Sequence, residues 1–340
     1  MKIYGWQADT SACGFYRIEQ PFSAMAAAGI SAEARIELTG SEMIEADAVV
    51  VQRASTIEAL EIMVLAREYG ARFIYEVDDL LFHLDPANSV FGHYSQKYVQ
   101  DVMRMAMQVC AGMTVSTEAL AEEMRALVDY DVHVVPNCLP DYFELLGHGA
   151  RGMMNAVDET APTRVLWAGS FTHAGDFVKE ARYGLRRAID WGGADFTCMG
   201  GDYRRQLQTP DASYVSWSDG IPEFHASLVG YEVGLCPLAL TRFNRSKSGL
   251  KAMEYQAAGI VPVASNCEAY RSVITDGVDG FLCGTQSQWK DALMTLATEP
   301  ETRLRMRRAA LRNTTERLVK SNTSVWVEAY TSILGSRDSS

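Results

Sequence analysis

Basic side chains gather around the start of one predicted helix in the second half of the chain. The helix is indicated by Leu250, Met253 and Ala257, which recur at helical spacing and would face a core. Unpaired backbone N–H groups and the helix dipole favour an anion at such an N-terminus, so a phosphate group would fit there. The basic residues of this stretch are Arg242, Arg245, Lys247 and Lys251.

A carboxylate shares one face of this helix with two of the cations. Lys247, Lys251 and Glu254 fall at positions i, i+4 and i+7. The Glu254 carboxylate could act as a bidentate acceptor for two hydroxyl protons, as a ribose requires. The pattern therefore predicts a site for a nucleoside diphosphate. The alternative interpretation is a solvated polar helix face that binds no ligand.

The elements that must position these residues are the helix and the strand that follows it. Gly259 suits the end of the helix because glycine takes the left-handed conformation without steric cost. The apolar run 260–265 suits a strand buried on both faces. Strands alternate with helices in the same way along most of the chain, which is typical of doubly wound parallel sheets. Earlier strands are expected at 2–6, 34–38, 46–52, 72–77, 113–116, 132–136, 164–170 and 194–200.

The length of 340 residues exceeds the usual limit for one hydrophobic core, so two domains are expected. Residues 139–162 lack periodicity and contain three glycines, and we interpret them as the linker. The predicted domains span residues 1–145 and 160–318, with a last amphipathic helix at about 320–336.

The segment from Asn244 to Ser265, together with the turn from Asp276 to Leu282, resembles the donor-site signature of retaining glycosyltransferases of the GT-B fold. This large family includes enzymes similar to sucrose synthase and glycogen synthase. The family pattern has two glutamates separated by seven residues, and Glu254 matches the second, which holds the nucleotide ribose. Ser246 stands at the position of the first glutamate, which in many relatives touches the donor sugar. This departure leaves the identity of the donor sugar open. The run from Asn244 to Ser248 is similar to a branch common in bacteria and their phages.

The resemblance implies two Rossmann-like domains that face a cleft, an α/β arrangement in which the last helix returns to the first domain. It also implies that the second domain binds a UDP or GDP sugar. Lys247 and Arg242 are expected to stabilise the leaving diphosphate. Arg17 could equally be a surface helix residue that contacts no donor. The turn after residue 169 could equally be a capped structural turn with no ligand. Donor contacts are expected at Gly14, Arg17, Gly169, Ser170, His173, Asn244, Ser246, Ser248, Gly249, Leu250, Lys251 and Glu254.

Two adjacent acidic residues, Asp78 and Asp79, follow the strand predicted at 72–77. They could suggest a divalent metal ion. We reject that interpretation because contiguous side chains in extended backbone point to opposite faces. The resemblance places such a pair near the acceptor, so one of the two is expected to orient the acceptor hydroxyl. Capping of a helix N-terminus is the alternative.

Composition limits the class of protein. No apolar run approaches the roughly 20 residues that span a bilayer, and the N-terminus reads as a first strand, so a cytoplasmic protein is expected, in the host cytoplasm if phage-encoded. Seven scattered cysteines favour buried thiols over disulfides or a zinc site. The net charge of −12 disfavours attraction to nucleic acid.

The expected reaction, as the resemblance implies, is sugar transfer from a nucleoside diphosphate donor to a hydroxyl with retention of configuration. In such enzymes the leaving phosphate oxygen accepts the acceptor's proton, so no general base is needed. No cofactor or metal is expected, because the cation cluster takes over the charge neutralisation that a metal supplies elsewhere and no His/Asp/Glu group has convincing ligand spacing. The acceptor is expected to be a small molecule, a glycan or a protein side chain. Two alternatives stay open: a phage-type enzyme that glycosylates hydroxymethylated bases in DNA, and a non-catalytic nucleotide-sugar-binding protein. The oligomeric state is left open.

Overall fold

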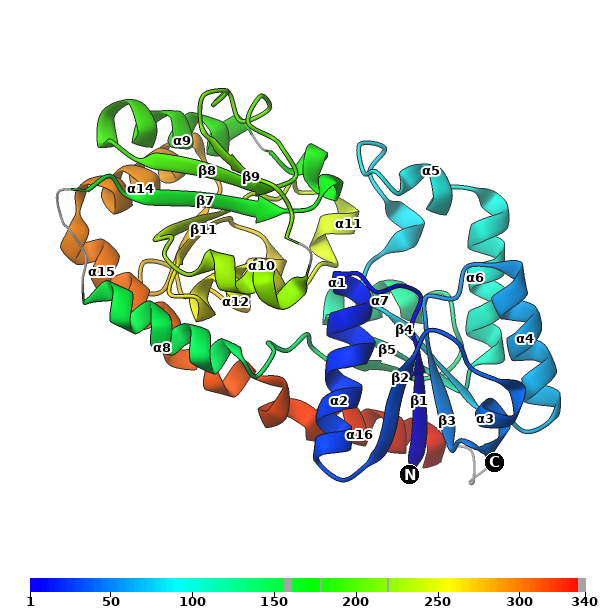
Figure 1. Cartoon of the computed structure of the whole chain (residues 1–340). Helices are drawn as coiled ribbons and strands as arrows, with labels where there is room; N and C mark the ends of the chain where they lie inside the picture. The colour runs from blue at the N-terminus through cyan, green and yellow to red at the C-terminus, as the bar shows by residue number, and fades with distance from the viewer. Residues whose placement is uncertain (156–160, 178, 219, 336–340) are drawn as a thin grey trace.

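A computed structural model of the protein describes residues 1–155, 161–177, 179–218 and 220–335. Two six-stranded sheets, in which every pairing is parallel, organise this part of the chain (Figure 1). The first sheet has the strand order β2-β1-β3-β4-β5-β6. Its strands are β1 (Lys2–Trp6), β2 (Ser31–Arg35), β3 (Ala48–Gln52), β4 (Phe73–Val77), β5 (Gly112–Val115) and β6 (Val132–Val134).

The second sheet has the order β12-β11-β10-β7-β8-β9, the arrangement of a classic dinucleotide-binding fold. In such sheets ligands bind beyond the carboxyl ends of the two strands where the order reverses, here β7 and β10. The strands are β7 (Arg164–Gly169), β8 (Asp195–Gly200), β9 (Ser213–Val215), β10 (Val233–Cys236), β11 (Val261–Ser265) and β12 (Phe281–Cys283). The predicted pair of Rossmann-like, doubly wound units is confirmed.

Helices cover the sheets and connect their strands. The helices among the strands of the first unit are α1 (Ala12–Gly14), a π-helix at Phe15–Glu19, α2 (Gln20–Ala27), α3 (Gly40–Glu45), α4 (Ile57–Glu68), a 3₁₀ turn at Leu81–His83, α5 (Phe91–Tyr94), α6 (Lys97–Val109) and α7 (Glu118–Arg125). Later helices are α8 (Phe143–Met154), a 3₁₀ segment at Phe171–Asp176, α9 (Lys179–Gly192), α10 (Ile221–Leu228), α11 (Arg242–Arg245), α12 (Leu250–Ala257), α13 (Glu268–Arg271), α14 (Gln286–Thr298), α15 (Pro300–Ala310), 3₁₀ turns at Leu311–Asn313 and Thr315–Arg317, and α16 (Val319–Gly335). No helix in the described ranges is both long enough and apolar enough to cross a membrane.

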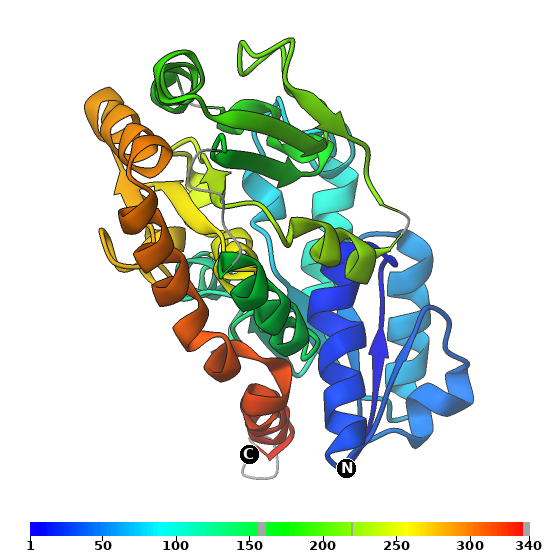
Figure 2. The ribbon, with the colours of Figure 1, turned by 60° about the vertical axis from the view of Figure 1, so that its left-hand side comes forward.

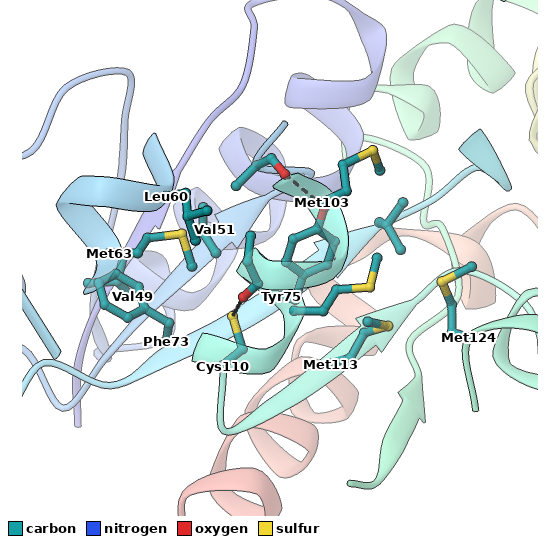
Figure 3. Close-up of a cluster of buried hydrophobic side chains, with 14 of the residues drawn as sticks. Val49, Val51, Leu60, Met63, Phe73, Tyr75, Met103, Cys110, Met113 and Met124 are labelled. Atoms are coloured by element: carbon teal, nitrogen blue, oxygen red, sulfur yellow. Dashed lines mark hydrogen bonds between the residues drawn. The ribbon is translucent and has the colours of Figure 1, made fainter. Parts of the chain in front are cut away.

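The core of the first unit forms where β3 and β4 meet α4 and α6. Figure 3 shows Val49 and Phe73 from the sheet beside Met63 of α4, and Met103 of α6 beside Tyr75. The Tyr75 hydroxyl donates a 3.1 Å hydrogen bond to the Ala54 carbonyl, so this buried phenol keeps a partner. The residues that directly follow β3 and β4, Arg53 and the pair Asp78 and Asp79, line the cavities of the candidate site.

The last helix, α16, belongs by packing to the first unit. It lies beside α2 in Figures 1 and 2, and its Tyr330 ring lies 6.2 Å from that of Phe22. A Cβ atom on Gly112 would lie 2.6 Å from the side chain of Ile333, so α16 also approaches β5 closely. The expected last residue of the helix, 336, lies outside the described residues. The exact limits of the two domains stay a prediction.

The segment predicted as a linker contains a helix instead. α8 occupies positions 143–154 and lies along α12, with Ala150 and Met154 packed against Leu311. Glycine disfavours a helix in isolation, but here Ala150 and Met154 pack closely on the end of α12, since a Cβ atom on Gly259 would lie 2.9 Å from the Ala150 Cβ and 2.6 Å from the Met154 side chain. Packing therefore overrides local propensity. Residues 156–160 of the predicted linker lie outside the described residues.

Candidate functional site

A cavity of about 230 Å³ lies between the two units at the carboxyl ends of β7 and β10. Residues from both units line it, so the site is made by their juxtaposition. From the second unit come Gly169, Ser170, His173, Leu238, Lys247, Ser248, Leu250, Lys251 and Glu254, and from the first Ala12, Tyr16, Asp78, Asp79 and Asn137. Seven of the twelve predicted donor contacts are in this set, together with three of the four predicted catalytic residues.

Lys251, in the first turn of α12, is held against the end of β7. Its ammonium donates to the carbonyl of Ala168 and lies 4.9 Å from the ring centroid of Trp167. A Cβ atom on Gly169 would lie 2.7 Å from the Nζ of Lys251, so the strand must end in glycine for the lysine to fit. Lys251 is half-buried, and burial lowers the pKa of its amine.

Lys247 precedes α12 and reaches the same cavity. Its Nζ lies 4.9 Å from the ring centroid of Phe243, and no carboxylate in the described part of the chain lies within ion-pair distance of it. Ser248, the next residue, accepts a 2.9 Å hydrogen bond from the Asn137 amide of the first unit. A cation without a partner beside a helix N-terminus is suited to bind an anion.

Glu254 lies further along α12, with only 12% of its side chain exposed. The Tyr16 hydroxyl donates a 2.6 Å hydrogen bond to its Oε1, and Nε2 of His225 lies 3.2 Å from the same oxygen. Burial alone would raise the pKa of Glu254, but the hydrogen bonds from His225 and Tyr16 bring it below its usual value. The carboxylate is therefore ionised and already shares one oxygen with two protein groups, which leaves only the other for a ligand.

His173 reaches the cavity from the turn after β7 and is held by a buried acid. Its Nδ1 lies 2.8 Å from Oδ2 of Asp176, whose Oδ1 accepts a 2.6 Å hydrogen bond from the Asn244 amide. Burial and the nearby Lys251 lower the pKa of His173 to about 3, so the imidazole is neutral at neutral pH. Asp176 therefore fixes this ring, and Asn244 supports Asp176 behind the cavity wall.

The predicted acidic pair follows β4 at the opposite side of the cavity. Burial and the charge of Asp78 raise the pKa of Asp79 to about 6. The argument that the two side chains point to opposite faces is wrong, because the backbone bends after β4. One oxygen of each carboxylate and the Cys13 thiol lie within 4.8 Å of one another. This proximity alone assigns no metal, since acidic groups often lie this close without one.

Arg17 does not reach the cavity. Its side chain is fully buried, and its Nε donates a 2.7 Å hydrogen bond to Glu76, which is equally buried. It also donates to the Val135 carbonyl and to Asn137 Oδ1. Arg17 is therefore neither a donor contact nor a surface helix residue. Its guanidinium links the π-helix to Glu76 of β4 and to the Val135 carbonyl. Gly14, the neighbouring candidate, serves loop packing, since an added Cβ would lie 1.9 Å from the Asp9 carbonyl oxygen.

The short helix α11 docks on the first unit instead of facing the cavity. Phe243 is buried in the core cluster of that unit, and Arg242, which is 57% exposed, makes a 2.6 Å ion pair with Glu123 of α7. The Ser246 hydroxyl is buried and lies 3.5 Å from the Arg242 carbonyl. Arg242 and Ser246 are therefore absent from the cavity, as is Gly249, whose added Cβ would lie 2.6 Å from the Ala269 carbonyl.

A larger cavity of about 680 Å³ adjoins the first and shares Asp79, Ser170 and Lys247 with it. Its walls include the loop after β1 and Arg53, whose backbone has a φ of 38°. Trp217 stands at the border of both cavities, 43% exposed and stacked on Phe224 at 4.7 Å. The sequence carries only a weak signal for Trp217, an aromatic residue in the stretch 217–221, where the family resemblance implies that the base is held; residue 219 of this stretch lies outside the described residues. It gives none for Tyr16, His225 or Arg53.

Comparison with known proteins agrees with this geometry. Residues 238–313 match the family described as glycosyl transferases group 1. This segment carries Lys247, Lys251 and Glu254, the charged part of the second unit's cavity wall. No curated protein sequence matches the chain.

Solved structures resemble the whole chain. HepE of Anabaena, in complex with UDP-glucose, has a TM-score of 0.69 at 12% identity, covering 98% of this chain and 100% of that one. Sucrose-phosphate synthase of Thermosynechococcus elongatus has a TM-score of 0.69 at 12% identity, and the match covers 99% of this chain and 100% of that one. The pneumococcal O-GlcNAc transferase GtfA, in complex with UDP and GlcNAc, has a TM-score of 0.56 at 15% identity, and the match covers 84% of this chain and 57% of that one. The fold of this chain is GT-B, as predicted.

Proposed function

We propose that this protein is a retaining glycosyltransferase that moves a sugar from a nucleoside diphosphate to an acceptor hydroxyl. One observation carries the proposal: Lys247, which has no carboxylate partner among the described residues, and the half-buried Lys251 flank the N-terminus of α12 in the same cavity as Glu254. Two cations and a helix N-terminus suit a diphosphate, and an ionised carboxylate on the same helix suits a ribose. The match of residues 238–313 to glycosyl transferases group 1 supports the same assignment.

UDP sugars are the first donors to test. HepE is described in complexes with UDP and with UDP-glucose, and its fold matches this chain over its full length. Trp217, exposed at the border of the two cavities, offers a flat surface on which a base could stack. GDP sugars are the alternative. The neutral imidazole of His173 would present a hydrogen-bonding nitrogen to the sugar or to the diphosphate.

The chemistry we propose needs no protein base. The leaving phosphate oxygen would take the proton of the acceptor hydroxyl on the face where the new bond forms, which retains configuration. Lys247 and Lys251 would stabilise the negative charge that grows on the diphosphate, so they would act more on turnover than on binding. Asp79 would orient the acceptor hydroxyl from the other wall of the cavity. On this scheme the two lysines take the place of a metal ion.

We place the acceptor in the larger cavity beside Asp79. Its charged lining consists of Glu19, Asp79, Arg53 and Lys247, and the Arg53 guanidinium is already paired with Asp9. On this scheme Lys247 binds the donor diphosphate, so the described lining offers no further unpaired cation for the phosphates of duplex DNA, and that acceptor is disfavoured. A neutral small molecule, a glycan or a protein side chain fits this lining better.

A second candidate, a non-catalytic protein that binds nucleotide sugars, has one observation in its favour. Ser246, at the position of the first family glutamate, is buried and outside the cavity, so no carboxylate from this position reaches a donor sugar.

Release of the nucleoside diphosphate separates the two candidates. The protein would be incubated with UDP-glucose, UDP-GlcNAc and GDP-mannose, with and without a mixture of hydroxyl acceptors, and the products followed by chromatography. We expect slow release of one diphosphate that acceptors accelerate, and loss of turnover in Lys247→Ala that exceeds its loss of donor affinity. Donor binding without any turnover would favour the non-catalytic candidate.

A further inference from the structure

The ribose subsite of the proposed donor site is not built by the second unit alone. Tyr16 belongs to the first unit and lies in the π-helix at Phe15–Glu19, buried to 3% exposure. Its hydroxyl crosses between the units to donate the 2.6 Å hydrogen bond to Glu254 Oε1. π-helical turns are rare and often occur at functional sites. Here the turn places the phenol beside the carboxylate.

A second group holds the same carboxylate oxygen. His225 of α10 is 1% exposed, and its Nε2 lies 3.2 Å from Glu254 Oε1 and 3.0 Å from the Tyr16 oxygen. Its Nδ1 lies 2.7 Å from the hydroxyl of Tyr142, just before α8. All these contacts are satisfied together when a neutral His225 carries its proton on Nε2 and Tyr142 donates to Nδ1. Tyr16 and His225 thus fix one oxygen of Glu254, and Tyr142 in turn holds His225.

The other oxygen is left for a ligand. Glu254 Oε2 has no hydrogen-bond partner in the described part of the chain and is not shut off from solvent, and Glu254 lines the cavity. A carboxylate whose Oε1 is fixed cannot rotate freely, so Oε2 keeps one direction.

We infer that Tyr16, supported by His225 and Tyr142, is a positioning residue that aims Glu254 Oε2 at the ribose hydroxyls of the donor, so that the first unit takes part in selecting ribonucleotides. The inference rests on the proposed function. The inference goes beyond the proposed function because it assigns a role in donor binding to Tyr16, which lies in the unit expected to bind the acceptor. A ribose without its hydroxyls would leave Oε2 unpaired, and the protein would discriminate against it.

The test compares two ligands in two proteins. Dissociation constants for UDP and for 2′,3′-dideoxy-UDP would be measured by calorimetry with the wild type and with Tyr16→Phe, or with the guanosine pair if GDP binds more tightly. We expect the wild-type preference for UDP to fall about fivefold or more in Tyr16→Phe, while affinity for the dideoxy nucleotide changes little. Tyr142→Phe should lower the same preference by a smaller factor.

Tyr130→Phe is the matched control, because the Tyr130 hydroxyl also donates a hydrogen bond, at 2.9 Å to the Met107 carbonyl, but lies away from the cavity. Its preference for UDP should equal that of the wild type. An unchanged preference in Tyr16→Phe, with both ligands weakened equally or not at all, would overturn this inference and leave the proposed function standing. A wild type that binds no nucleoside diphosphate would overturn both.

Discussion

Gly169 and Lys251 are matched to each other, since a Cβ atom on Gly169 would lie 2.7 Å from the lysine Nζ. The same Cβ would lie 3.1 Å from the buried ring of Trp167, which leaves the lysine as the group that must move. The glycine at the end of β7 therefore gives the ammonium its place beside the N-terminus of α12.

Gly169→Ala is expected to displace Lys251 and to weaken donor binding. The crowding should also destabilise the fold by about 1–3 kcal/mol, as overpacking usually does. Chemical denaturation and calorimetry with UDP would measure the two effects. Gly152→Ala is the matched control, because nothing lies within 4 Å of its added Cβ in helix α8 and alanine there should add about 0.4–1 kcal/mol of stability. Full UDP affinity in Gly169→Ala would contradict the role given to Lys251.

Asp79→Asn should change stability in a manner that depends on pH. The pKa of Asp79 is raised to about 6, so the folded state binds its proton more tightly than the unfolded chain does. The stabilisation from that proton is complete below the usual pKa of 3.8 and is lost as the pH rises through about 6. The gain in stability of the variant over the wild type should therefore be larger at pH 8 than at pH 4.5.

Urea denaturation at the two pH values checks this, with Asp211→Asn, at an exposed position, as a control that should show no such trend. An equal difference between variant and wild type at both pH values would show that Asp79 ionises normally. Activity of Asp79→Asn should fall at all pH values if this carboxyl orients the acceptor.

Arg17→Met should unfold the protein more easily instead of emptying the donor site. Removing one member of a fully buried ion pair leaves the Glu76 carboxylate without its charge partner, at a cost of about 3–5 kcal/mol. Arg35→Ala removes an ion pair that is about half exposed on both sides and should change stability by less than about 0.5 kcal/mol. Equal, small effects of the two substitutions on the free energy of unfolding would return Arg17 to the list of ligand-binding candidates.

Much of the fold could be predicted because residues close together in the sequence indicate the helices and strands. The apolar periodicity of α12 with its stop at Gly259 gives the helix, and the apolar run after it gives β11. The spacing of Lys251 and Glu254 within α12 puts both on the face toward the cavity, and Lys247, which precedes the helix, lines the same cavity. Local order sufficed here because one helix and the short loop before it carry the arrangement.

The rest depends on contacts between distant parts of the chain. Tyr16 and Glu254 are separated by 238 positions, and Arg17 and Glu76 by 59, so no spacing in the sequence joins either pair. Arg242 looks like a phosphate ligand by its position, but Glu123 of the other unit is its partner. The glycines of α8 suggest a linker, but the packing of α8 along α12 and of Ala150 and Met154 against Leu311 makes this segment a helix. In each case tertiary packing decided what the local residue types left open.

The most direct measurement is calorimetric titration of UDP, with GDP as the alternative, into the wild type, Lys247→Ala and Arg242→Ala. The account predicts that the wild type binds one of these diphosphates and that Lys247→Ala loses roughly 1.5–3 kcal/mol, about tenfold to a hundredfold in Kd. Arg242→Ala should bind like the wild type, because Arg242 lies outside the cavity in an exposed ion pair. Equal affinity of Lys247→Ala and the wild type, or no binding of either diphosphate, would contradict the assignment of this cavity as a donor site.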